Sequence, residues 1–189
     1  WWTYLQTPRE QLEALYRLGR AKDIPSLKKA ASMVSAAGVN VMYGNAQGDI
    51  AWLATAKLVK RADSVNSYTL LDGSTGKDDI QGFYDFSENP HSVNPPWGYV
   101  YSANNQPDTA NGVLHPGYYL PEDRAKRISQ LLEAKNDWSV EDMKQMATDV
   151  VSATNPQVVQ SMLTAAGSLD SEDATQQAAA KLLAEWDGN

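Results

Sequence analysis

Apolar residues recur at helical spacing through the first part of the chain. Residues 7–10 read Thr-Pro-Arg-Glu, a helix-start pattern in which Thr7 is the N-cap and proline takes the first helical position. We predict one helix from there to about Gly19 and a second from Asp23 to about Gly38. The second helix would bury an apolar face that consists of Ile24, Leu27, Ala30, Ala31 and Val34. We interpret both helices as packing elements.

Residues 39–45 and 50–56 are rich in β-branched and aromatic residues, and they flank a connection that contains glycine. This pattern predicts a β-hairpin. Most positions in both strands are apolar, as expected for a sheet that is covered on both faces. Asn40 opens the first strand. Because a buried asparagine must be hydrogen-bonded, Asn40 is either a structural clasp, which we favour, or a group of a functional site.

Residues 89–107 combine prolines, aromatic residues and amides. The prolines in the first half bias the chain toward extended conformations, and we predict that residues 97–103 form a short apolar strand. The strand would end in Asn104-Asn105-Gln106-Pro107, a turn sequence. Asn104 has two possible roles: it closes the turn, or it aims its amide N–H at a developing oxyanion. On spacing alone, the turn is the commoner role.

Residues 57–82 and 108–120 lack helical or strand periodicity and are expected to be loops. The string Asp72-Gly73-Ser74-Thr75-Gly76 is no phosphate loop, because the Lys-Ser/Thr pair is missing. The nearby acidic residues lack the spacing of a calcium-binding helix–loop–helix, so we predict a solvated loop. The aromatic residues within 82–86 are expected to pack this loop against the core.

Helical patterns fill the remainder of the chain. A helix is expected to begin near Pro121 with acidic residues in its first turn, and its apolar face includes Ile128. Ser139 and Asp142 form the capping box of another helix. Two more are expected at about 156–166 and 171–186. The predicted fold class is therefore α+β, one partial domain over 1–189 with a helical pair, sheet and loops in 1–120 and a helical part in 121–189.

The composition limits the classes of binding partner and of catalytic chemistry that this chain could have. The chain has 189 residues, 42% hydrophobic and 21% charged, with a net charge of −7 and a pI near 4.8. This acidity argues against nucleic acid or an anionic membrane as a partner. Without cysteine there is neither a disulfide nor a thiol nucleophile. The apolar runs are too short to span a bilayer.

No catalytic set stands out from residue types alone. His91 and His115 lack neighbouring ligands at metal spacing, so we expect no metal site. The chain begins Trp1-Trp2 and stops soon after Trp186, and we interpret both ends as those of an excised segment.

Three strings, in this order along the chain, resemble the penicillin acylase family of N-terminal-nucleophile hydrolases. Residues 40–52 are similar to the family's hairpin motif N-x-x-Y-A-D-x-x-G-N-I-x-Y, with a few departures. Residues 89–105 are similar to its motif N-P…N-P-x-x-G-Y-I-x-x-x-N-N. Residues 123–128, Asp-Arg-Ala-Lys-Arg-Ile, resemble the start of its next helix, and the parallel continues to 182–188.

The resemblance implies a part of a four-layer αββα fold, taken from the β-chain. Family members are made as a precursor that cleaves itself and so exposes a serine at the new N-terminus of the β-chain. This serine attacks an amide carbonyl and forms an acyl-enzyme. The resemblance assigns the oxyanion-binding amide to Asn104 and an orienting arginine to Arg124. Arg124 could instead pair locally with Glu122 or Asp123. The implied substrates are small N-acyl amides, including β-lactam side chains and acyl-homoserine lactones.

The departures from the family limit what this chain does by itself. Residue 1 is tryptophan, so we expect the nucleophile to lie upstream and this chain alone to be inactive. The expected partners are the remaining α- and β-chain segments, with no nucleic acid and no membrane. We expect no cofactor; calcium in the parent enzyme stays open, since its ligands match no residue here. The resemblance suggests a periplasmic or secreted enzyme.

Two other classes of function remain open. Five aromatic residues could form a platform that binds a sugar or peptide without catalysis: Trp97, Tyr99, Tyr101, Tyr118 and Tyr119. Residues 121–187 could also form a helical interaction domain.

Overall fold

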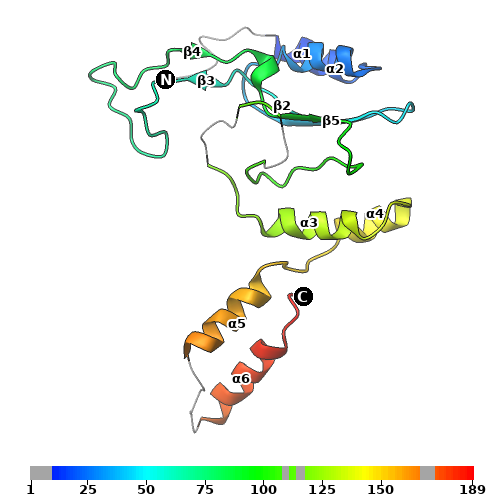
Figure 1. Cartoon of the computed structure of the whole chain (residues 1–189), viewed down its shortest axis with the longest axis vertical. Helices are drawn as coiled ribbons and strands as arrows, with labels where there is room; N and C mark the ends of the chain where they lie inside the picture. The colour runs from blue at the N-terminus through cyan, green and yellow to red at the C-terminus, as the bar shows by residue number, and fades with distance from the viewer. Residues whose placement is uncertain (1–9, 108–110, 114–117, 167–172) are drawn as a thin grey trace. The chain divides into compact units, whose positions relative to one another are not determined.

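The computed structural model describes residues 10–107, 111–113, 118–166 and 173–189 (Figure 1). The chain divides into two compact units, each of which has its own internal contacts. The first comprises residues 1–102 and 106–119, and the second comprises 103–105 and 120–189. Helices and short antiparallel strands occur together, which gives an α+β protein.

Two helices open the described part of the first unit. Helix α1 spans Gln11–Leu18 and follows Glu10. Thr7, the predicted N-cap, lies outside the described residues. Helix α2 spans Ile24–Ala31 and begins as predicted, because the side chain of Asp23 accepts a hydrogen bond from the Ser26 backbone N–H at 2.8 Å in a capping box. It ends at Ala31 and not near residue 38, so the prediction of its length was wrong.

A three-stranded antiparallel sheet forms the centre of the first unit. Its order is β1 (Asn40–Gly44), β2 (Ile50–Ala54) and β5 (His91–Val93). The predicted hairpin is confirmed, with Gly44 opposite Ile50 at the turn. The Asn45 side chain holds this turn by accepting from the backbone N–H of residue 49 at 2.9 Å.

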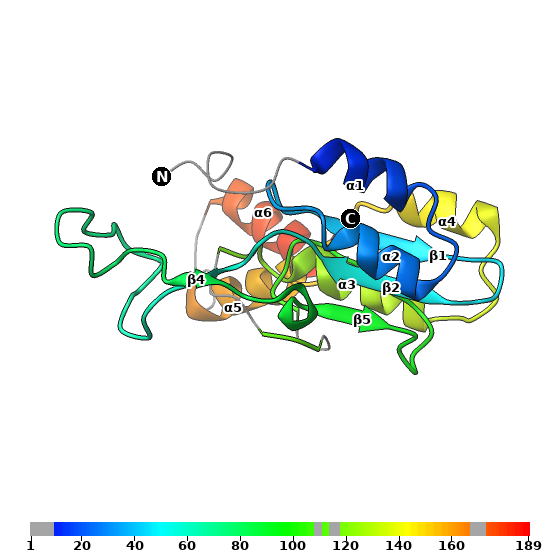
Figure 2. The same ribbon diagram turned by 90° about the horizontal axis from the view of Figure 1, so that it is seen from above.

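The core of the first unit lies between α2 and the sheet, where Leu27 and Ala31 meet Ala51 and Leu53 (Figure 2). Strand β2 is the buried one, with its three middle residues covered on both sides. In β1, exposed and half-buried residues alternate, so the expectation that both of its faces are covered was wrong. The pattern is that of an outer strand with one covered face.

The third strand does not lie where the sequence pattern placed it. The predicted strand at 97–103 is irregular, and β5 occupies His91–Val93. Asn94 adopts a positive φ of 46° and ends the strand. The two prolines that follow have no N–H to donate to a ladder, and the Gly98 N–H turns back onto the Pro95 carbonyl at 3.0 Å.

A long loop of the first unit connects two very short strands. Strands β3 (Val59–Lys60) and β4 (Gly82–Phe83) pair at its base. The residues between them are mostly exposed, as the predicted solvated loop requires. A short 3-10 helix, η2 (Phe86–Glu88), follows, and Phe86 packs on the core cluster, which confirms the expected packing for this residue of the aromatic segment.

The second unit is helical, as predicted. Its helices are α3 (Asp123–Glu133), α4 (Val140–Ala147), α5 (Asn155–Ala166) and α6 (Ala174–Glu185). The capping box of Ser139 and Asp142 at the start of α4 is present. Helices α5 and α6 pack against each other. None of the helices in the described ranges is long and apolar enough to cross a bilayer.

Candidate functional site

Asn104 and Arg124 lie together in the second unit. One nitrogen of the Arg124 guanidinium, Nη2, donates to the Asn104 amide oxygen at 2.9 Å and to the Ala103 carbonyl at 2.7 Å. The Leu120 backbone N–H donates to the Asn104 carbonyl at 2.9 Å. The two residues that the resemblance singled out are therefore joined directly, although 20 positions separate them in the sequence.

The contact with Arg124 fixes which way the Asn104 amide faces. A guanidinium has only N–H donors, so it can bind the oxygen of a carboxamide but not its nitrogen. The oxygen of Asn104 therefore faces Arg124, and the NH₂ group, with two donors, lies at the other edge of the amide plane. An oxyanion donor must offer an N–H of this kind.

Asn104 is also a turn residue. Its φ is +61°, a left-handed conformation that asparagine tolerates better than most residues. The two readings of Asn104 are thus compatible in geometry: the turn places the residue, and Arg124 orients its side chain.

Arg124 forms none of the local ion pairs considered from the sequence. Glu122 pairs with Lys126 at 3.1 Å. Asp123 instead accepts hydrogen bonds from Thr154, through Oγ1 at 2.8 Å and the backbone N–H at 2.9 Å. Within the described ranges Arg124 has no ion pair, so its charge serves the Ala103–Asn104 turn.

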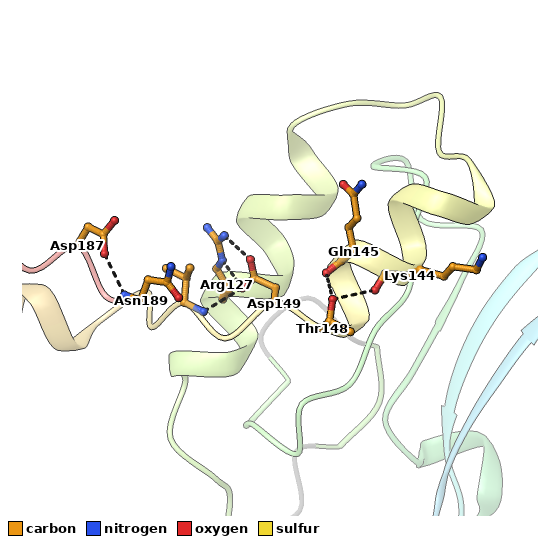
Figure 3. A network of polar contacts seen from close by, with 8 residues as sticks. Arg127, Lys144, Gln145, Thr148, Asp149, Asp187 and Asn189 are labelled. Carbon is orange, nitrogen blue, oxygen red and sulfur yellow. Dashed lines mark hydrogen bonds and ion pairs between the residues drawn. The ribbon is translucent and has the colours of Figure 1, made fainter.

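A second arginine anchors the helix that carries Arg124. Arg127 donates to both carboxylate oxygens of Asp149, from Nε at 2.8 Å and from Nη2 at 2.6 Å (Figure 3). Both side chains are largely covered, at 27% and 18% exposure. These hydrogen bonds hold the pKa of Asp149 below its ordinary value. Nothing in the sequence pattern identified this bidentate pair.

Asn40 acts as a clasp, the role that we favoured. Its amide oxygen accepts from the Trp52 indole N–H at 3.0 Å, and its Nδ2 donates to Ser102 Oγ at 2.9 Å. The residue is exposed, so the premise that it is buried was wrong. The clasp ties the outer strand to residue 102, just before the turn that contains Asn104.

The candidate aromatic platform is only partly assembled. The rings of Tyr99 and Tyr101 lie 6.3 Å apart but are tilted by 43°. Tyr118 is 88% exposed, whereas burial raises the pKa of Tyr119. Tilted rings with unequal exposure do not make the flat stacking surface that a sugar-binding platform uses.

His91 makes a hydrogen bond within its own segment. His91 Nδ1 lies 2.8 Å from the Asn89 carbonyl, which only accepts, so this nitrogen carries the proton. His115 lies outside the described residues. In the part of the chain that the structure describes, no three His, Cys, Asp or Glu side chains gather at a distance suited to a metal ion.

The penicillin amidase family model matches the chain over residues 1–189. The chain belongs to the penicillin amidase family. This membership confirms the resemblance of the three sequence strings.

Two proteins that the chain is similar to are named as acylases. The chain is 30% identical over 122 residues to the acyl-homoserine lactone acylase QuiP of Pseudomonas putida and 27% identical over 139 residues to that of Pseudomonas fluorescens. These matches cover 64% and 67% of the chain but 15% and 16% of the relatives. The chain thus spans about a sixth of their length.

A thermostable penicillin G acylase from Alcaligenes faecalis has a similar structure, with a TM-score of 0.71 and 24% sequence identity. The match covers 95% of this chain and 32% of that chain. It confirms the predicted fold class, α+β within a penicillin acylase fold.

Proposed function

We propose that this chain is part of an amidohydrolase that cleaves the amide bond of a small N-acyl compound, and that Asn104 binds the oxyanion of the reaction. The family membership and the acylase relatives support the reaction class. The 2.9 Å contact from Arg124 to the Asn104 amide oxygen is the observation on which the role of Asn104 rests.

In the proposed reaction, an N-terminal serine outside the 189 residues attacks the substrate carbonyl carbon. The α-amine of that serine accepts the hydroxyl proton and passes it to the departing amine nitrogen, which leaves an ester between serine and the acyl group. Water then cleaves the ester by the same proton route and releases the acid. This chain would supply hydrogen bonding but no nucleophile, so we expect it to be inactive alone.

Asn104 contributes by donating a hydrogen bond to the carbonyl oxygen as negative charge develops on it. An amide that is already held in place needs little reorganisation when the charge appears, and such a donor lowers a barrier by roughly 2.7–4 kcal/mol. Arg124 holds the amide from the opposite side. Because its guanidinium carries a full charge, it also polarises the amide and strengthens the N–H donor.

The test is a set of substitutions in a full-length acylase that contains this sequence. Asn104→Ala should lower kcat by roughly 10²–10³. Asn104→Asp is the sharper variant, because its carboxylate can still bind Arg124 but has no N–H, so the turn is kept while activity falls at least as far. Asn105→Ala is the matched control and should stay within about tenfold of the original kcat. Full activity in Asn104→Asp would disprove the oxyanion role.

A further inference from the structure

Helix α3 is attached at two points on one face, about one turn apart, near its start. Asp123 and Arg127 are four residues apart, so their side chains project from the same face of the helix. Asp123 binds Ser152 and Thr154, and Arg127 binds Asp149. Both contacts lead to a single segment, residues 149–154, which we call the anchor segment.

The contacts at the helix start centre on one carboxylate oxygen. Asp123 Oδ1 accepts from Ser152 Oγ at 3.0 Å, from Thr154 Oγ1 at 2.8 Å and from the Thr154 backbone N–H at 2.9 Å. A carboxylate with three donors is strongly held, and the pKa of Asp123 is lowered, chiefly by the Thr154 hydroxyl. This contact stops the helix end from moving along its axis.

The second contact, between Arg127 and Asp149 one turn further along the helix, restrains rotation of α3 about its axis. The fork of Arg127 meets both oxygens of Asp149, a planar geometry that a single hydrogen bond cannot enforce. Asp149 Oδ1 also accepts from the Val151 backbone N–H at 3.3 Å, which fixes the carboxylate to its own segment. Two contacts one turn apart therefore define both the position and the rotation of the helix start.

The anchor segment is itself hydrogen-bonded to the last residues of the chain. The Ser152 backbone N–H donates to the Gly188 carbonyl at 2.8 Å. Gly188 has a positive φ of 100°, and a Cβ there would lie 2.5 Å from the Ser152 carbonyl oxygen, so only glycine fits. Beside it, the Asn189 N–H donates to Asp187 at 3.0 Å (Figure 3). The segment is therefore held on both sides.

Arg124 lies between the two attachment points in sequence, and its reach to Asn104 depends on them. The outer surface of a helix lies about 5–6 Å from its axis, so a rotation of roughly 10° moves a side chain tip by about 1 Å. A displacement of that size breaks a 2.9 Å hydrogen bond. In an active site, a shift of about 1 Å can cost on the order of 10²-fold in rate.

We propose that Asp149, through Arg127, and Thr154, through Asp123, are positioning residues that hold the Arg124 guanidinium against the Asn104 amide. Their effect passes through helix α3. The consequence for catalysis rests on the proposed function of Asn104, whereas the mechanical coupling to Asn104 does not.

The coupling can be measured by ¹⁵N NMR in a full-length acylase that contains this sequence. The Asn104 side-chain NH₂ signals are assigned by their loss in Asn104→Ala, and Arg124→Ala gives the signal position of an amide that has lost its orienting contact. Asp149→Asn keeps the shape of the side chain but presents an NH₂ to the donors of Arg127. We expect it to move the Asn104 NH₂ signals most of the way to their position in Arg124→Ala. Thr154→Val should move them in the same direction by less, because its backbone N–H contact remains.

The matched control is Glu122→Gln, which removes the exposed pair with Lys126 on the same helix. It should leave the Asn104 signals unchanged. If Asp149→Asn unfolds the chain, Arg127→Lys replaces it, since lysine keeps the charge but loses the bidentate geometry. Asn104 signals at their original position, either in a folded Asp149→Asn variant whose Arg127 Nε–H signal has moved or in a folded Arg127→Lys variant, would overturn the proposal.

Kinetics in a full-length acylase then separate the two claims. If both hold, Asp149→Asn lowers kcat by about tenfold or more with KM little changed, and Glu122→Gln changes neither. If Asn104 is not the oxyanion donor, the NMR coupling persists while kcat is unaffected. A loss of activity without any movement of the Asn104 signals would refute positioning and leave the proposed function intact.

Discussion

Replacing Asn89 tests how much one buried amide contributes to the sheet of the first unit. Asn89 is 2% exposed and precedes β5. Its Nδ2 donates to the Ala54 carbonyl at 3.0 Å and to the Ala56 carbonyl at 2.9 Å, just at and beyond the end of β2. The side chain therefore supplements the short β2–β5 ladder, which pairs only three residues on each strand.

The expected loss follows from these contacts. Each hydrogen bond contributes roughly 0.5–1.5 kcal/mol, and truncation of a buried side chain adds a cavity, so Asn89→Ala should cost about 2–4 kcal/mol. Asn89→Asp should cost more at neutral pH, because it places a carboxylate against two carbonyl oxygens in a buried site. Urea unfolding followed by circular dichroism and tryptophan fluorescence measures both values.

An exposed asparagine serves as the control for the buried Asn89. Asn66 caps a turn in the exposed loop by accepting from the Tyr68 N–H at 3.0 Å, and Asn66→Ala should stay within about 0.5 kcal/mol of the unchanged chain. Equal losses at positions 66 and 89, or a loss below about 0.5 kcal/mol for Asn89→Ala, would refute the reasoning.

Three further predictions concern stability. Asp23→Ala removes the N-cap of α2 and should lower the free energy of unfolding measured in urea titrations. Gly112→Ala should lower the Tm, because φ is +97° and a Cβ would collide with the Asn89 carbonyl oxygen. Asp149 has a lowered pKa in the folded chain. Its contribution to stability is therefore present above the unfolded pKa of about 3.9 and is lost as the pH falls through the folded pKa. Asp149→Asn should lose less stability than the unchanged chain between neutral pH and pH 3, and an equal loss would contradict this.

Elements with local signals were predictable from the sequence. The capping box at Ser139 marked one helix start, and Asp23 stood before another; in both places the side chain satisfies backbone N–H groups within one turn. The hairpin was equally local, since the turn at Asn45 is closed by its own side chain. The end of α2 was not predictable in this way: the apolar spacing continues to Val34, which is buried although it lies beyond the helix.

Non-local pairing explains the misplaced strand. Residues 97–103 are apolar and aromatic, yet β2 pairs with His91–Val93. Which segment pairs with β2 depends on which one can offer backbone N–H groups to the edge of that strand. The prolines at 95 and 96 have none to offer, and they separate the predicted segment from the sheet.

The contacts of the candidate site are also non-local and could not be predicted from local sequence patterns. Asn104 looked like a turn residue by spacing, and only the family resemblance suggested its link to Arg124. The pair of Arg127 and Asp149 gave no signal, because its members lie 22 positions apart and carboxylates near helices usually cap or face solvent. A contact that forms only after α3 meets the anchor segment cannot be inferred from periodicity.

The binding of two inhibitors by a full-length acylase tests the role of Asn104 most directly. One is a tetrahedral phosphonate that carries the acyl group and mimics the oxyanion, and the other is the corresponding carboxamide, which mimics the ground state. Asn104→Ala should weaken the phosphonate by roughly 10²–10³ and the carboxamide by far less, because the amide acts mainly on developing charge. Equal weakening of both ligands, or no weakening of the phosphonate, would contradict the account.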